Sequence, residues 1–155
     1  LRSAAMAGND EEVILAATAV LTDAKVAPEL ENEARYYRAQ SLVKVNQMAH
    51  AVADWQSLAQ DTRNAYGAEA KYRLAQYLFD AGKTAEAEKE VLNYLEVSTP
   101  HAYWLARSFV LLSDIYAKLD RKLEARQYLL SLKQNYQAAD DIAGMIESRL
   151  EKLNE

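Results

Sequence analysis

The sequence predicts an all-α fold built from antiparallel helix hairpins. Three observations support this prediction. Residues that favour helices, such as Ala, Leu, Glu, Lys, Arg and Gln, dominate the composition. Residues that break helices are rare, with 4 Gly and 2 Pro among 155 residues, as expected of long helices joined by short turns. One segment also recurs along the chain, which indicates a repeat architecture.

The recurring segment is centred on small residues. Ala39 and Ala75 lie 36 residues apart, and around each of them Ala, a basic residue, Tyr, Ala, Gln and Leu recur in register. Ser113 follows Ala75 by 38 residues in a third, more diverged copy. We call these three the central small residues. Each is followed twelve residues later by an alanine, namely Ala51, Ala87 and Ala125. Small residues at these positions let neighbouring helices approach closely.

Apolar stripes at helical spacing place the helices within each copy. Tyr66–Asp80, Ala102–Leu119 and Leu123–Tyr136 each carry such a stripe. The last segment has one apolar and one polar face, as expected of a helix that caps a stack. We therefore expect a partial repeat at residues 1–27, repeats at about 29–61, 65–99 and 101–136, and a capping helix at 140–155. Together they would form a single domain over residues 1–155 that belongs to a longer protein.

The second copy contains small and apolar residues in the order Leu74, Ala75, Leu78, Gly82, Ala87, Val91 and Pro100. This order resembles the tetratricopeptide repeat, whose period is about 34 residues. The resemblance covers most of Glu29–Tyr136. It departs from the family in its longer periods, in lacking the Trp of the first helix, and in having Pro at the end of one repeat only. Related helical-hairpin repeats therefore remain alternatives. The resemblance implies a right-handed α–α superhelix of about three repeats.

The resemblance also implies a binding face. In that family, residues three before and one after the central small residue line a concave surface that binds a partner peptide or helix. The matching positions are Tyr36 and Gln40, Tyr72 and Gln76, and Val110 and Asp114, flanked by Lys44, Phe79, Asp80 and Lys118. The alternative is that the tyrosines pack in the interior and the glutamines are merely solvated. The clamp for a C-terminal carboxylate found in some members needs Lys and Asn at these positions, so that activity is not implied.

Composition argues against other classes of function. A net charge of −5 disfavours nucleic-acid binding, and no apolar run is long enough to insert into a membrane. The chain has no Cys, its His50 and His101 are far apart, and its glycines are too dispersed for a phosphate-binding loop. We therefore expect a protein that is not an enzyme and that uses no metal or cofactor.

A structural role is the second hypothesis. The half-repeat at Leu1–Leu21 would be an open end, with apolar surface exposed around Val13, Ala17 and Leu21. Such a surface favours a homo-oligomer or a spacer within a larger protein. The long repeats are also similar to those of bacterial cell-envelope assembly proteins and outer-membrane lipoproteins. That similarity implies a periplasmic or outer-membrane-associated location.

Overall fold

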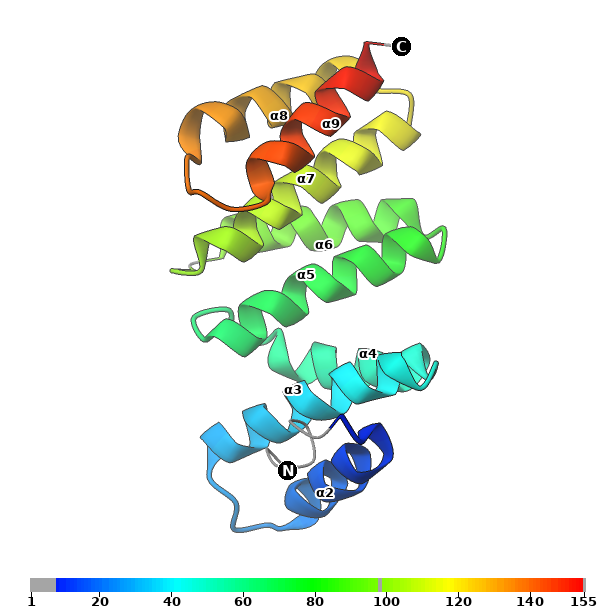
Figure 1. Cartoon of the computed structure of the whole chain (residues 1–155), viewed down its shortest axis with the longest axis vertical. Helices are drawn as coiled ribbons and strands as arrows, with labels where there is room; N and C mark the ends of the chain where they lie inside the picture. Colours follow the sequence, from blue (N-terminus) through cyan, green and yellow to red (C-terminus); the bar gives the residue numbers. More distant parts are fainter. Residues whose placement is uncertain (1–7, 98, 155) are drawn as a thin grey trace. The chain divides into compact units, whose positions relative to one another are not determined.

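The computed structural model describes residues 8–97 and 99–154, and within them it contains only α-helices and no strand (Figure 1). The helices are α2 (Asp10–Thr22), α3 (Pro28–Lys44), α4 (Met48–Leu58), α5 (Ala65–Asp80), α6 (Thr84–Glu96), α7 (Ala102–Lys118), α8 (Lys122–Asn135) and α9 (Ile142–Leu153). The predicted all-α class is confirmed. The first residues of the predicted half-repeat, 1–7, lie outside the described part of the chain.

The chain divides within α5 into two compact units, Leu1–Ala70 and Lys71–Glu155. In the first unit α2 packs on α3 and α3 packs on α4. In the second unit α6 packs on α7, α7 on α8, and α8 on α9, and α7 also contacts α9. In Figure 1, α7 and α9 lie in front of α6 and α8. Helices that follow one another in sequence therefore pack as hairpins, as predicted. That residues 1–155 form a single domain stays a prediction.

Each hairpin turns through one residue with a positive φ at the same place in the repeat. These residues are Asn46, Gly82 and Asp120, with φ of 64°, 81° and 61°. The following residue donates its N–H to the carbonyl five positions earlier, from Gln47 to Leu42, from Lys83 to Leu78 and from Arg121 to Tyr116, over 2.7, 2.9 and 2.8 Å. This is the long hydrogen bond of a Schellman turn. Gly8, before α2, also has a positive φ of 73°. The repeat is therefore one of backbone conformation as well as residue type.

We expect Asp120→Gly to raise the free energy of unfolding by about 0.5 kcal/mol, because aspartate is strained at positive φ and glycine is not. Gly82→Ala should lower it by about 1 kcal/mol for the converse reason. Urea denaturation followed by circular dichroism measures both. A loss of stability on Asp120→Gly would show that the aspartate side chain, and not its backbone, determines the turn.

The predicted small positions form the packed interior. Ala39, Ala75 and Ser113 are each 1% exposed. The residues five positions after each positive-φ residue are Val13, Ala51, Ala87 and Ala125, and none is more than 1% exposed. The small side chains, together with Val13, thus lie in the packed interior, where close helix packing requires small residues.

The predicted apolar surface at the beginning of the chain is not present. Val13 and Ala17 are 1% and 0% exposed, because α2 packs on α3 through this face, and Leu21 is half-buried. The exposed apolar residue of α2 is Leu15, at 72%, which lies on the opposite side of the helix from Val13 and Ala17. The expectation of an open end around these residues is therefore wrong.

None of the described helices combines the length and the apolar character that crossing a bilayer requires.

Candidate interaction surface

In the first unit, Tyr36 and Gln40 lie one turn apart on α3 and are joined by a hydrogen bond. The Gln40 Nε2 donates to the Tyr36 hydroxyl over 2.8 Å, and that hydroxyl donates to Glu69 Oε1, on α5, over 3.1 Å. The ring of Tyr36 packs at 4.5 Å from that of Tyr66. Tyr36 is half-buried while Gln40 is exposed. The pair therefore forms a fixed polar surface at the edge of the interior.

In the second unit, Tyr72, Gln76 and Asp80 follow one another at single turns of α5. The Tyr72 hydroxyl donates to Gln76 Oε1 over 3.1 Å, and Gln76 Nε2 donates to Asp80 Oδ1 over 2.8 Å. Tyr72 itself is only 4% exposed. Its ring lies in the interior, as the packing alternative expected, whereas Gln76 is half-buried and Asp80 is exposed. The accessible part of this row is thus the two polar side chains.

The hydrogen bond between tyrosine and glutamine runs in opposite directions in the two pairs. The residue that each tyrosine contacts on the following hairpin, Glu69 on α5 or Arg107 on α7, determines the direction. A carboxylate can only accept, so the Tyr36 hydroxyl donates its hydrogen bond to Glu69, and the hydroxyl oxygen accepts from Gln40. A guanidinium can only donate, and Arg107 Nη2 donates to the Tyr72 hydroxyl over 2.9 Å. The Tyr72 hydroxyl must then donate its own hydrogen bond to the side-chain oxygen of Gln76. These partners fix the orientation of both amides.

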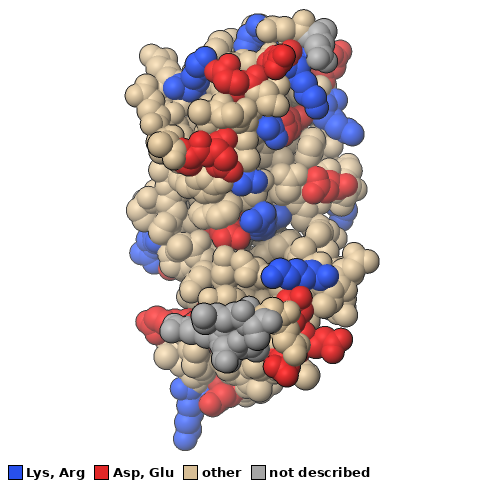
Figure 2. Space-filling view, viewed as in Figure 1, with Lys and Arg blue, Asp and Glu red and all other residues tan. Residues whose placement is uncertain are grey.

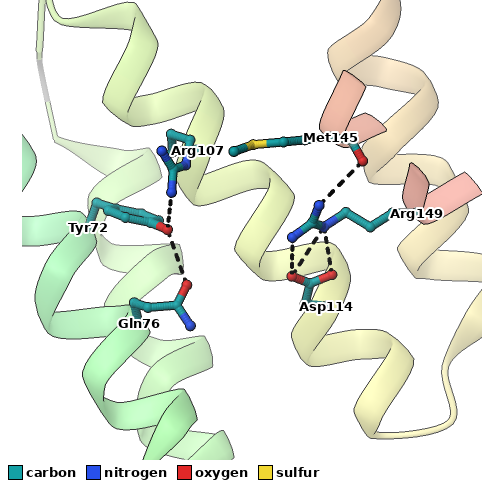
Figure 3. A network of polar contacts seen from close by, with 6 residues as sticks. All are labelled: Tyr72, Gln76, Arg107, Asp114, Met145 and Arg149. Carbon is teal, nitrogen blue, oxygen red and sulfur yellow. Dashed lines mark hydrogen bonds and ion pairs between the residues drawn. The ribbon is translucent and has the colours of Figure 1, made fainter. Parts of the chain in front are cut away.

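Arg107 extends the second network from α5 to α7, and Figure 3 shows its hydrogen bond to Tyr72. This residue of α7 bonds the Tyr72 hydroxyl through Nη2 and the Tyr103 hydroxyl through Nη1, over 2.9 and 3.0 Å. Its guanidinium carbon lies 4.8, 5.9 and 6.0 Å from the ring centroids of Tyr72, Tyr103 and Trp104. The positive charge is therefore held by hydroxyl groups and aromatic rings.

Tyr103 links Arg107 to the turn before α9. Its hydroxyl accepts from Arg107 and donates to the carboxylate of Asp141, 2.9 Å from Oδ1. Burial raises the pKa of Tyr103, and the Asp141 carboxylate contributes to the rise. The hydroxyl therefore stays protonated at neutral pH and can serve as acceptor and donor at the same time. The result is a fixed connection between α7 and the start of α9.

Asp114 is occupied by an ion pair rather than open to a partner. Arg149, on α9, donates from Nε to Asp114 Oδ1 over 3.0 Å and from Nη2 to Oδ2 over 3.2 Å (Figure 3). Such a two-pronged pair is the strong geometry for arginine and carboxylate. The predicted binding residue Asp114 thus holds the capping helix in place.

The remaining predicted residues fall into two groups. Lys44 and Lys118 are exposed near the ends of α3 and α7. Phe79 is half-buried against the apolar cluster of the second unit. Val110 is 3% exposed and belongs to the cluster that contains Leu129. The prediction that Val110 lies on an open face is therefore wrong, because its apolar side chain packs into the interior.

Sequence reasoning missed Glu69 and Arg107, which form hydrogen bonds with the hydroxyls of Tyr36 and Tyr72. Both stand six positions before a central small residue, Ala75 and Ser113 respectively. Glu69 and Arg107 lie 33 and 35 residues after the tyrosines that they contact. Aligning the copies and examining this position would have found both. The missed signal was a change from acidic to basic residue at one place in the repeat.

We expect Tyr72→Phe to lower the free energy of unfolding by about 1 kcal/mol, since its buried hydroxyl bonds both Arg107 and Gln76. Tyr36→Phe should cost less, because Tyr36 is only half-buried and water can reach its partners. Chemical denaturation of the two variants side by side measures the difference. Equal losses would mean that the two hydroxyls have the same environment.

Comparison of the chain with models of protein families, with curated proteins and with solved structures found no match. Among residues 8–97 and 99–154, no group of three or more His, Cys, Asp or Glu side chains is arranged to hold a metal ion. The function must therefore be argued from the surface described above.

Proposed function

We propose that the chain is a non-catalytic protein-interaction module of tetratricopeptide-type repeats. Its partner is an extended peptide or a helix that binds, within each unit, beside the first helix of a hairpin. The observation that carries this proposal is the fixed orientation of Gln40 and Gln76. Each is oriented by a tyrosine whose hydroxyl is bonded to the first helix of the following hairpin. Groups held in place before binding lose little entropy when a partner arrives.

The two glutamines offer complementary groups to a peptide backbone. Gln40 uses its amide nitrogen within the protein, and its oxygen receives no hydrogen bond from any described residue. That oxygen can accept from a peptide N–H. Gln76 uses its oxygen for Tyr72 and one N–H for Asp80, which leaves its second N–H to donate to a peptide carbonyl. Each unit therefore provides one polar contact of defined direction.

The surface charge suits a peptide partner. On the face drawn in Figure 2, acidic and basic side chains are interspersed among uncharged ones. Together with the net charge of −5, this favours local, directional recognition over attraction to a polyanion. Transient interfaces of this mixed character are common among protein-interaction modules. The relation to cell-envelope proteins stays a prediction.

The hypothesis of self-association assumed that an apolar surface is exposed at the first hairpin, and the burial of its residues removes that support. Val13 and Ala17 lie against α3 and offer nothing to a second copy. Leu15 is exposed, but a single exposed leucine is normal on a soluble protein. The interaction module is therefore the function that we propose.

The test is selection of end-blocked peptides from a displayed random library on the immobilised chain, followed by measured affinities for variants. Gln40→Ala in the first unit and Gln76→Ala in the second should weaken the peptides bound at each by about tenfold. Gln56→Ala on α4 and Lys89→Ala on α6 are matched controls, because both residues are exposed on second helices. These controls should change affinity less than about twofold.

Circular dichroism should be the same for all four variants, since none removes a buried side chain. If the library yields no binding peptide, or if the selected peptides respond only to the α4 and α6 controls, the proposed function is wrong.

A further inference from the structure

We propose that Arg107 binds an acidic side chain, Asp or Glu, of the partner segment in the second unit. The inference rests on the proposed function and names the chemistry that the partner must bring. It starts from an imbalance around Arg107, whose half-buried guanidinium has two uncharged hydroxyl groups, of Tyr72 and Tyr103, as its hydrogen-bond partners.

The hydrogen bonds of Arg107 leave donors available. Nη1 and Nη2 each give one hydrogen bond, to Tyr103 and Tyr72. Within residues 8–97 and 99–154, no carboxylate forms an ion pair with this guanidinium, whereas Arg38 pairs with Asp54 and Arg149 pairs with Asp114. Half-buried charges are normally paired, so Arg107 is equipped for one more ligand of opposite sign.

The surrounding rings hold the cation without neutralising it. Tyr72 lies 4.8 Å from the Arg107 guanidinium and 5.6 Å from that of Arg73, and Trp104 lies 6.0 and 5.4 Å from the same two groups. Two guanidinium groups therefore share the same two rings. A ring quadrupole attracts a cation but carries no net charge. The positive charge of Arg107 therefore stays available to a carboxylate.

The acidic groups of the network are connected to Arg107 only through other side chains. Asp141 is reached through the Tyr103 hydroxyl, and Asp80 through Gln76 and Tyr72. These relays orient the hydroxyls so that their oxygens face the guanidinium, and they position Arg107 without filling its free donors. A carboxylate arriving from outside would complete the set with a direct ion pair.

The neighbouring positions on α7 favour a side chain over a chain terminus. One turn beyond Arg107 stands Val110, which has no polar group to offer, and a further turn on stands the anionic Asp114. A C-terminal carboxylate bound to Arg107 would find no second hydrogen-bond donor at Val110 or Asp114. An internal Asp or Glu needs only the one cation and lets the peptide continue past Gln76 on α5.

The test titrates the complete ¹⁵N-labelled chain with the end-blocked peptide Ac-Ala-Tyr-Glu-Leu-Ala-NH2 and with the same peptide carrying Gln for Glu. The signals to follow are the Arg107 Nε–H and the Gln76 side-chain amide. We expect the Glu peptide to bind at least about fivefold more tightly than the Gln peptide, as a part-exposed ion pair gives. Its titration should shift both signals.

Two variants assign the effect. Arg107→Gln should abolish the preference for the Glu peptide, because it removes the charge while keeping a donor for the tyrosines. Arg149→Gln is the matched control: it removes an arginine from the same face that already has its carboxylate, and the preference should persist. The Glu/Gln comparison on the unaltered chain decides the matter even if Arg107→Gln fails to fold.

Equal affinity for the Glu and Gln peptides, with the Gln76 amide still shifting, would overturn this inference and leave the interaction module standing. Binding of Ac-Ala-Tyr-Gln-Leu-Ala with a free C-terminal carboxylate as tightly as the blocked Glu peptide would also overturn it, because the terminus would then be the ligand. Failure of the library selection described above is the distinct result that removes the proposed function itself.

Discussion

Gly67→Ala should lower the free energy of unfolding by about 3 kcal/mol, the largest effect that we expect from adding one methyl group. Gly67 lies in the first turn of α5, where the preceding turn folds closely over it. A Cβ there would lie 1.9 Å from the Asp61 carbonyl oxygen and 2.5 Å from that of Leu58. Both are backbone atoms, so neither can move aside as a flexible side chain would.

The same contacts define how the backbone would respond. The Gly67 N–H donates to Asn64 Oδ1 over 2.8 Å, and Asn64 Nδ2 donates to the Asp61 carbonyl over 3.1 Å. Relieving the clash would break this turn. Urea denaturation measures the loss, and the matched control is Gly144→Ala on α9, where a Cβ meets nothing within 4 Å. The control should raise stability by about 0.5–1 kcal/mol, since alanine is the better helix former. Changes of the same sign at both sites would contradict the structure around Gly67.

Asp54→Ala should lower the free energy of unfolding by about 2–3 kcal/mol, because it leaves a partly buried cation without its counter-ion. Arg38 donates to both oxygens of Asp54, over 2.8 Å from Nε and 2.6 Å from Nη2, and so joins α3 to α4. The Asp54 side chain is 3% exposed and that of Arg38 is 24% exposed. The exposure of Arg38 keeps the expected cost below that of a fully buried pair.

The measurement is a double-mutant cycle with Arg38→Ala, in which the double variant should lose less than the two single losses added together. Glu147→Ala is the matched control, because Glu147 pairs with Lys133 at 2.7 Å while both side chains are more than half exposed. That control should cost less than about 0.5 kcal/mol. If the Asp54 and Glu147 variants were equally stable, the pair on α3 and α4 would be no more than a surface contact.

The sequence predicted the hairpins well because their positions depend on local patterns. The central small residues and the alanines twelve positions later are buried as expected, since close helix packing requires small side chains at fixed spacing. At the start of α2, the Asn9 side chain accepts a hydrogen bond from the Glu12 N–H, a cap that the sequence analysis did not identify.

The candidate surface could be predicted only in part, because a side chain's exposure depends on the residues that lie across from it. Tyr36 and Tyr72 hold the same place in the repeat, yet only Tyr72 is buried. Tyr72 lies 5.7 Å from the ring of Trp104 and under Arg107, while Tyr36 faces Tyr66 and Glu69. A pattern read along one helix contains no information about these partners on the next.

The positive-φ turns show where this repeat can change its length. The central small residue precedes the turn residue by seven positions in every copy, as Ala39 does Asn46 and Ser113 does Asp120. The buried residue after the turn is always five positions further on. The difference between periods of 36 and 38 residues therefore arises between the buried alanine of one hairpin and the central small residue of the next. It lies in the helices, because α6 continues to Glu96 and α4 only to Leu58, while the connector before α7 is no longer than the one before α5. The outer ends of the helices can therefore change in length, whereas a single residue inserted between the central small residue and the turn would rotate one helix face away from the interior.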